Sequence, residues 1–438
     1  MTRKKLPDWS WAPRFCIQHD WLPALEDDTC KKFWVSYYGE DKADPASIHG
    51  SVRAHGGAES LTLFSQEFEN VSKDGRELTV ELDDNLGATF IYHDKRLQAG
   101  NGQFKARFLD VSPGESLALA SDSDVGPDGL SKIQVIDIKS REIKLSLSIE
   151  PTPHLGRFFP SGEVIIFALH NEICLAGLKD GQIVRRFKGH SESVTQIEFI
   201  EAGRNFVSSS TDGTIRLWEC SSGEQVSEWE SELVPRGSIN CLYVYQHDEE
   251  TEFSAEEAKK YFWKKTTFAL YGTEEGYVQC ISLPTGKLVA GMFCRSAVLS
   301  MELLPDRLIA GCRDGRIYTF WRKPNKSEEW NVGFSFMVSY FYPHPVYAMS
   351  AQLAQSQEGI FKGDLYISFG ATGVALFRIV EHEEDLEIDD PDEKPLRPMH
   401  NELTGADCEP IQQIFNRSNG IWTTSRDGFL FFYSLRDS

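Results

Sequence analysis

Short runs of apolar residues alternate with polar and small residues along most of the chain, and residues 189–220 show the pattern most clearly. An apolar run at 194–199 is followed by small residues at 206–210, by Thr211-Asp212-Gly213 and by the alternating run Ile215-Arg-Leu-Trp218. A period of two predicts β-strands. Because an Asp-Gly pair supplies the positive φ angles that a tight turn requires, we expect antiparallel strands joined by short turns.

Two further pairs of residues mark this segment as a repeat. It begins with Gly189-His190, and its last alternating run ends with Trp218 followed by the acid Glu219. A unit that opens on Gly-His, places Asp-Gly at a turn and closes on Trp followed by an acid is typical of one blade of a WD40 β-propeller. The segment therefore predicts an all-β propeller.

The polar residues of this unit predict a buried hydrogen-bond network. We expect it to join Asp212, His190, a strand hydroxyl and the indole N–H of Trp218, so that each buried polar group has a partner. Ser210 is the favoured hydroxyl and Ser208 the second choice. Since networks of this kind make a core rigid, the predicted role is structural rather than catalytic or metal-binding.

Weaker copies of the unit occur on both sides of this segment. Seven units lie at about 106–148, 154–188, 189–231, 237–293, 297–336, 343–405 and 408–438. Strands of this length and spacing predict a seven-bladed WD40 β-propeller over residues 101–438, preceded by an N-terminal β-rich extension over residues 1–100.

The last unit ends after its third strand, so we expect the missing outer strand to come from the N-terminal region. The best candidate is 78–93, where Leu78–Leu82 and Ala88–Tyr92 alternate apolar and polar residues. Such closure removes an exposed sheet edge. The rest of the extension holds four of the ten tryptophans, which predicts a packed unit. It is either a small β-rich cap on the propeller or a separate partner-binding domain.

Two insertions interrupt the repeats. Residues 246–262 contain Ser254-Ala-Glu-Glu257, a capping box that predicts a short helix. Residues 381–393 hold nine acids in thirteen positions. Such a run is typical of a solvated loop, and a contact with a partner is the alternative.

The composition limits the partners. A formal net charge of −21, from 66 acidic and 45 basic residues, opposes binding to nucleic acid and to anionic membranes and favours basic protein surfaces. The nine cysteines form no Cys-x-x-Cys pair, which predicts reduced thiols and a cytoplasmic and nuclear location. No apolar run has the length of a secretory signal or a membrane span.

Motifs that carry chemistry are absent from the sequence. It contains no glycine-rich phosphate loop and no Gly-x-Ser-x-Gly turn, and His344, His382 and His400 lack the spacing of metal ligands. We therefore expect a protein that is not an enzyme and that holds no cofactor and no metal. A propeller fold alone does not exclude catalysis.

Three groups of residues resemble one family. The first is 203–208 with 212–220, the second is Glu402–Pro410 with Arg426-Asp427-Gly428, and the third is 17–25 with 158–162. In these segments the chain resembles the proteasomal ATPase-associated factor of animals and its fungal counterpart, an assembly chaperone of the proteasome regulatory particle. Residues 403–408 are the most specific, because they lie outside the general WD40 pattern.

The resemblance implies a non-catalytic assembly chaperone. Such a protein binds the C-terminal domain of an AAA ATPase subunit of the regulatory particle and delays the docking of that particle on the core particle. It also implies a protein that is a monomer by itself and has other assembly chaperones as further candidate partners. The alternatives are a generic WD40 scaffold and a ubiquitin-ligase substrate adaptor. The adaptor is the weaker alternative, because Trp218 and Trp321 are not followed by the Asp-x-Arg of those receptors.

The turns between second and third strands give a candidate binding rim. In this repeat they emerge on the same side as the loop that enters each blade, whereas 381–393 belongs on the opposite side. We expect the carboxylates Glu274 and Glu275 to meet basic residues of the ATPase domain, while the acidic run stays solvated. The candidate partner-binding residues are Asp122, Asp124, Glu274, Glu275, Arg313, Asp314 and Arg426.

Overall fold

The computed structural model describes most of the 438-residue chain. The described residues are 14–26, 32–38, 47–55, 62–83, 86–98, 106–122, 125–126, 128–231, 237–250, 253–254, 261–305, 307–321, 337–341, 344–354, 362–370, 373–379, 396–406, 410–417 and 419–434. They are almost entirely β-structure with one short helix, α1 (Trp21–Glu26). Within them, no helix is long and apolar enough to cross a membrane.

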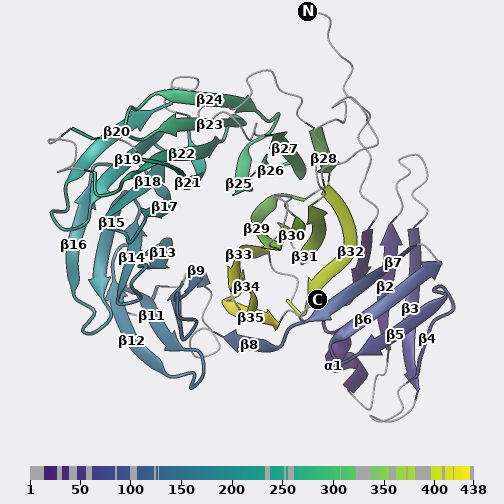
Figure 1. Cartoon of the computed structure of the whole chain (residues 1–438). Coiled ribbons are helices and arrows are strands. Elements are labelled where there is room, and N and C mark those ends of the chain that lie inside the picture. The colour runs from purple at the N-terminus through teal and green to yellow at the C-terminus, as the bar shows by residue number, and fades with distance from the viewer. Residues whose placement is uncertain are drawn as a thin grey trace, which may run out of the picture.

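Antiparallel sheets follow one another around a ring, and we name them blade one to blade seven in chain order (Figure 1). Blade one has β9 (Ala106–Val111), β10 (Leu117–Asp122), β11 (Ser131–Asp137) and β12 (Ile143–Ile149). Blade two has β13 (Leu155–Phe158), β14 (Val164–Leu169), β15 (Glu172–Gly177) and β16 (Ile183–Lys188). Blade three has β17 (Val194–Ile200), β18 (Asn205–Ser210), β19 (Thr214–Glu219) and β20 (Gln225–Glu230).

The second half of the ring repeats the arrangement. Blade four has β21 (Ile239–Glu250), β22 (Lys265–Thr273), β23 (Tyr277–Ser282) and β24 (Leu288–Phe293). Blade five has β25 (Val298–Leu303), β26 (Arg307–Cys312), β27 (Arg316–Trp321) and β28 (Met337–Phe341). Blade six has β29 (Val346–Ala354), β30 (Lys362–Phe369), β31 (Val374–Ile379) and β32 (Leu396–Thr404), and blade seven has β33 (Ile411–Arg417), β34 (Gly420–Ser425) and β35 (Phe429–Ser434).

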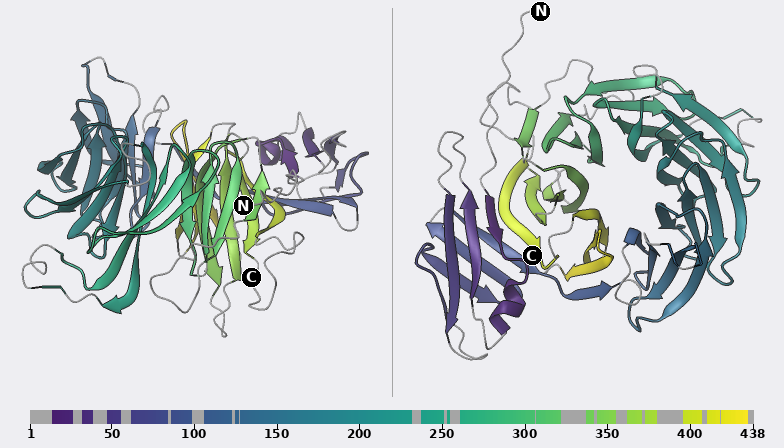
Figure 2. Two further views of the ribbon diagram at one scale, coloured as in Figure 1. Left: turned by 90° about the horizontal axis from the view of Figure 1, so that it is seen from above. Right: turned by 180° about the vertical axis from the view of Figure 1, so that it is seen from behind.

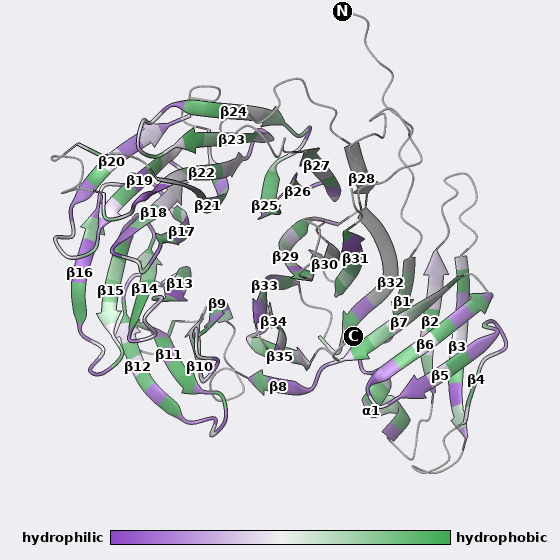
Figure 3. Ribbon diagram, in the orientation of Figure 1, coloured by the Kyte–Doolittle hydropathy of each residue, from purple (hydrophilic) through white to green (hydrophobic). Residues whose placement is uncertain are grey.

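The hydrophobic core lies between successive blades. The first strand of each blade lies beside the first strand of the next, and β34 of blade seven contacts β9 of blade one. Each core cluster of the ring combines apolar side chains of two neighbouring blades, for example Phe187 of blade two with Phe206 and Trp218 of blade three. Most positions of the second strands are buried, and in β18 all of them are, whereas the outer strand β12 alternates hydrophobic and hydrophilic residues (Figure 3). A WD40 β-propeller is the fold that these sheets define.

The N-terminal residues form a second unit beside the ring (Figure 2). One sheet contains β1 (Arg14–Ile17), β2 (Lys32–Tyr38), β3 (Ser47–His55) and β4 (Thr62–Phe64), in that order. It packs, together with α1, against β5 (Asn70–Asp74), β6 (Glu77–Asp83) and β7 (Leu86–Tyr92). Strand β7 also pairs in parallel with β32 of blade six, so that the two units share one seven-stranded sheet. We call β1–β7 with α1 the N-terminal unit.

The ring is closed by a strand that the sequence analysis did not select. The outer strand of blade seven is β8 (Lys95–Gln98), which pairs antiparallel with β35. The expected segment, 78–93, instead forms β6 and β7, and its Leu78, Val80 and Phe90 are buried in the N-terminal unit. The expectation that the N-terminal region supplies the strand is confirmed, but the segment was wrong. Its alternation reflects burial in the N-terminal unit rather than on the propeller.

Other expectations fall outside the described residues. Of the segment 254–262, for which a helix is predicted, the structure describes Ser254, Tyr261 and Phe262, which lie in neither helix nor strand. The acidic run 381–393 also lies outside the described residues. Helix α1 was not predicted. The blade count and the division of the chain at residue 100 stay predictions.

The closing strand gives a test of stability. Leu97 of β8 is buried in the cluster that joins blade seven to blade one. We expect Leu97→Asp to lower the free energy of unfolding by about 3 kcal/mol or more, because it removes apolar contacts and buries a carboxylate. Gln98→Asp, at a half-buried neighbour, should cost less than half as much. Equal denaturation midpoints for Leu97→Asp and the unmodified protein would contradict closure by β8.

Candidate functional site

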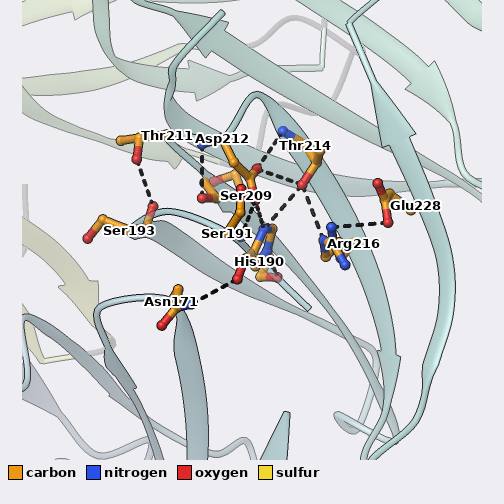
Figure 4. A network of polar contacts seen from close by, with 12 residues as sticks. Asn171, His190, Ser191, Ser193, Ser209, Thr211, Asp212, Thr214, Arg216 and Glu228 are labelled. Carbon is orange, nitrogen blue, oxygen red and sulfur yellow. Dashed lines mark hydrogen bonds and ion pairs between the residues drawn. The ribbon is translucent and has the colours of Figure 1, made fainter. Parts of the chain in front are cut away.

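The polar network of blade three joins four side chains, of which Figure 4 labels His190 and Asp212. Nδ1 of His190 lies 3.0 Å from Asp212 Oδ2, and Nε2 of His190 lies 2.8 Å from Ser208 Oγ. The indole Nε1 of Trp218 donates to Ser208 Oγ at 2.8 Å. Since an ionised carboxylate only accepts, a neutral imidazole that carries its hydrogen on Nδ1 satisfies every group, and Ser208 then donates to Nε2.

The strand hydroxyl in this network corrects the favoured choice of the sequence analysis. Ser208 connects His190 with Trp218, whereas Ser210 Oγ accepts the backbone N–H of Asp212 at 3.1 Å. Both serines lie on β18 and point to the same side, because side chains repeat every second residue along a strand. Ser208 lies within hydrogen-bond distance of the Trp218 indole, whereas Ser210 lies at the turn.

Asp212 fixes both the turn and the side chain of His190. Its carboxylate accepts the backbone N–H of Ser191 at 3.0 Å and that of Thr214 at 2.8 Å. Burial raises the pKa of Asp212, but the hydrogen bonds from His190, Thr214 and Ser191 together outweigh burial and keep that pKa well below its ordinary value. The network therefore joins the turn of blade three to its entry loop and to the buried side chains of β18 and β19.

The turns between second and third strands are fixed to the loops that enter the blades. Thr211 N–H donates to Ser193 O in blade three, and the same bond recurs in the four blades that follow. The donor and acceptor pairs there are Glu274 to Ser238, Arg313 to Ala297, Gly370 to Pro345 and Arg426 to Pro410. In blades three to seven these bonds place the turn and the entry loop at one edge of the ring. We call this edge the rim.

Two of the predicted binding residues are brought together at the rim. Arg313 of blade five forms a two-pronged ion pair with Glu274 of blade four, with Arg313 Nη2 lying 2.8 Å from Glu274 Oε2. Asn240 Nδ2 donates to the same oxygen at 3.0 Å. Burial raises the pKa of Glu274, while the hydrogen bonds from Arg313 and Asn240 bring it below its ordinary value. Glu274 is thus held by its own chain, and Glu275 beside it is exposed.

The structure leaves the other predicted binding residues on separate blades. Asp314 pairs with Arg316 of its own blade. Arg426 is exposed on the turn of blade seven, and Asp122 is half-buried at the end of β10. Asp124 lies outside the described residues.

Polar side chains of the first strands join neighbouring blades, and the sequence analysis missed them. Asp110 Oδ2 accepts the N–H of Phe158 at 2.7 Å from blade one to blade two. The same bond joins Gln196 Oε1 to Leu242 N–H at 3.0 Å and Glu302 Oε1 to Ala351 N–H at 2.9 Å. Each of these residues shares its strand with other polar residues, such as Thr195 and Glu198 beside Gln196 in β17, so the sequence gives no clear signal for them.

Asp110 and Glu302, the two carboxylates among these first-strand residues, have pKa values that burial raises. Burial raises the pKa of Asp110, although Arg157 and Arg417 oppose the shift. Burial also raises the pKa of Glu302 to about 7, against the hydrogen bond from Ala351 N–H. The nearby hydroxyl of Tyr243 has a pKa of about 12, because of burial first and the charge of Glu302 second. Within the described residues, no group of three or more His, Cys, Asp or Glu side chains is arranged to hold a metal ion.

Comparison with known proteins agrees with the fold. Residues 181–219, which contain the blade-three network, match the WD domain, G-beta repeat. An uncharacterized WD repeat-containing protein of Synechocystis is 28% identical over 30% of this chain and 36% of its own length. The Set1 complex component swd2 of Schizosaccharomyces pombe is 33% identical over 19% of this chain and 24% of its own length.

A third relative covers more of the chain. The protein ROOT INITIATION DEFECTIVE 3 of Arabidopsis thaliana is 25% identical over 40% of this chain and 39% of its own length. The chain thus spans between a quarter and two fifths of these curated relatives. Taken with the sheets and the blade-three network, these matches define a WD40-repeat protein with a β-propeller fold, a class that typically serves as a protein-interaction scaffold.

The blade-three network gives a mutational test. Trp218 is 1% exposed and packs against Phe187 and Phe206. Trp218→Ala should lower the free energy of unfolding by about 3–5 kcal/mol, because a buried aromatic ring and its hydrogen bond are lost together. Ser208→Ala should cost more than Ser210→Ala, because Ser208 satisfies two side-chain groups. Denaturant titration of the three variants measures the order, and a larger loss for Ser210→Ala would refute the assigned network.

The carboxylate of Glu302 gives a pH test. Because the folded pKa of about 7 exceeds the ordinary value of 4.5, the folded state binds the proton more tightly, and stability falls as pH rises between these values. Glu302→Gln can still accept the Ala351 N–H. It should raise the free energy of unfolding by about 1–2 kcal/mol near pH 8 and leave it unchanged near pH 4. A Glu302→Gln protein that is less stable than the unmodified chain near pH 8 would contradict the assignment.

Proposed function

We propose that this protein is a non-catalytic assembly chaperone of the proteasome, and that it acts in the cytoplasm and nucleus. In this proposal the rim binds the C-terminal domain of an AAA ATPase subunit of the regulatory particle. A propeller bound there would cover the ATPase surface sterically and delay the docking of the regulatory particle on the core particle.

The contact between two segments of the chain is the observation that carries this proposal. Residues 17–25 and 402–410 both resemble the proteasomal ATPase-associated factor family. Trp21 Nε1 donates to Thr404 Oγ1 at 2.9 Å, across 383 positions of sequence, in a buried contact. Tyr433 of blade seven donates to Thr404 O at 2.9 Å. The described parts of these two segments therefore form one structural joint between the N-terminal unit and blades six and seven.

The rim has the physical properties that protein binding requires. Its turns are hydrogen-bonded to the entry loops, so little conformational entropy is lost when a partner binds. The net charge of −21 favours a basic partner surface and speeds its approach. Because Glu274 is bound by Arg313, the exposed carboxylate of Glu275 is the better candidate for contact with a basic partner residue.

A second candidate function is that of a general scaffold within a multiprotein complex. The relative from Schizosaccharomyces pombe is by its name a component of the Set1 complex, and its similarity covers 19% of this chain. A rigid rim suits either function. The two candidates differ in the partner that the rim selects, so a purified ATPase domain distinguishes them.

The direct test is capture of a purified proteasomal ATPase C-terminal domain by the full chain. We expect Glu275→Lys to weaken binding about three- to tenfold and to flatten its dependence on salt, because an attraction at the rim becomes a repulsion. Glu224→Lys is the matched control, since Glu224 is exposed on the turn between β19 and β20. Deletion of residues 383–392 should leave capture unchanged.

Calorimetry over a range of salt concentrations measures these effects. If none of the regulatory-particle ATPase domains binds the unmodified chain, the chaperone proposal fails and the general scaffold remains. Binding that is abolished by the deletion and unaffected by Glu275→Lys would show that the rim is the wrong surface.

A further inference from the structure

The outer face of the sheet β1–β4 carries exposed aromatic side chains. The inner face of this sheet is covered by β5–β7, and its Phe33, Val35 and Val52 are buried. The opposite face of an antiparallel sheet in water is normally polar. Here Trp34 of β2 is 46% exposed and Phe64 of β4 is 50% exposed. These two aromatic residues are the largest exceptions to the alternation of buried apolar and exposed polar residues along the strands of this sheet.

The same face carries basic side chains beside the aromatic rings. Lys32 of β2 lies opposite Arg53 of β3, and Arg53 lies opposite Phe64. Trp34 lies opposite Ser51, two residues along from Arg53 on the same face. Cross-strand neighbours lie about 5 Å apart and diagonal ones about 7–8 Å apart, so these side chains form one continuous patch. We call Lys32, Trp34, Arg53 and Phe64 the aromatic-basic patch.

The basic groups of this patch are available to a partner. Lys32 and Arg53 are exposed, and within the described part of the chain neither forms an ion pair. The described cross-strand partners of Lys32 and Arg53 include no carboxylate, since Lys32 pairs with Arg53 and Arg53 with Phe64. The patch is therefore locally basic on a chain whose net charge is −21.

We propose that the aromatic-basic patch binds a short acidic segment of a partner protein that also carries a large apolar side chain. The aromatic rings would cover the apolar side chain, and Lys32 and Arg53 would pair with the carboxylates. Because nucleic acid extends its charge beyond the patch, it would be repelled by the acidic remainder of this chain, whereas a short segment has its charge only where the patch compensates it.

This inference does not depend on the proposed function. The patch lies on the N-terminal unit, which is held to blade six by the pairing of β7 with β32 and by the bond between Trp21 and Thr404. The rim is formed by turns and entry loops of the propeller, and it shares no residue with the patch. A partner on the patch and a partner on the rim would therefore be held in a fixed relation by one chain.

The test uses a fluorescein-labelled octapeptide, acetyl-Glu-Asp-Phe-Glu-Asp-Leu-Glu-Asp-amide, and measures fluorescence anisotropy with the full chain. We expect micromolar binding, at least about tenfold weaker for Trp34→Thr, because an exposed aromatic anchor dominates small interfaces. Arg53→Glu should weaken binding by a similar factor and remove its salt dependence. Phe64→Thr, on the edge strand, is a second aromatic variant.

Matched controls test whether the effect is local. Phe293→Thr removes an aromatic residue that is 49% exposed on β24, and Lys144→Glu reverses an exposed charge on β12. Neither control, nor Glu275→Lys at the rim, should change peptide binding, and thermal melting should confirm that every variant folds. The proposal is overturned if the folded patch variants bind the peptide as the unmodified chain does, if no peptide binding occurs, or if a single-stranded oligonucleotide of equal charge binds more tightly.

Discussion

The antiparallel pairing of β8 with β35 is the interaction on which the ring depends. Each core cluster lies between two successive blades, so no blade can bury its apolar side chains alone. The last blade must therefore meet the first, and Leu97 of β8 contributes to the cluster that joins them. Since β8 directly follows β7, which pairs with β32, the segment that closes the ring also positions the N-terminal unit.

Local features of the sequence predicted the strands and their turns, because these depend on neighbours in the chain. The glycines of the predicted Asp-Gly and Glu-Gly turns have positive φ angles, among them Gly213 at 82° and Gly276 at 91°. The closing strand could not be predicted in this way. Alternation in 78–93 shows that one face of each strand is buried, but it does not specify which unit covers that face. The closing strand itself has four residues, of which Leu97 is the buried one, and it gives almost no periodic signal.

The polar contacts, like the closing strand, could not be predicted from local sequence alone. Ser208 and Ser210 occupy equivalent faces of β18, and the choice between them depends on how β17, β18 and β19 are aligned, including a register shift between Val194 and Gln196. Likewise Glu274 looked like a free carboxylate, whereas Arg313 of the next blade lies against it. Glu302 bonds to a backbone group 49 positions away. Contacts across blades arise from the stacking of repeats, and no short stretch of sequence specifies them.

The rim and the aromatic-basic patch differ in the distance over which charge acts on a partner. The net charge of −21 acts on a basic partner at distances up to the screening length of about 8 Å at physiological salt, and this favours approach to the ring as a whole. The aromatic-basic patch has the opposite local sign, so an acidic segment is first repelled by the molecule and attracted only at contact. Affinity there must come from burial of Trp34 and Phe64 together with ion pairs that form only at contact. Binding at the patch should therefore combine apolar contact with short-range charge, whereas binding at the rim should depend mainly on long-range charge.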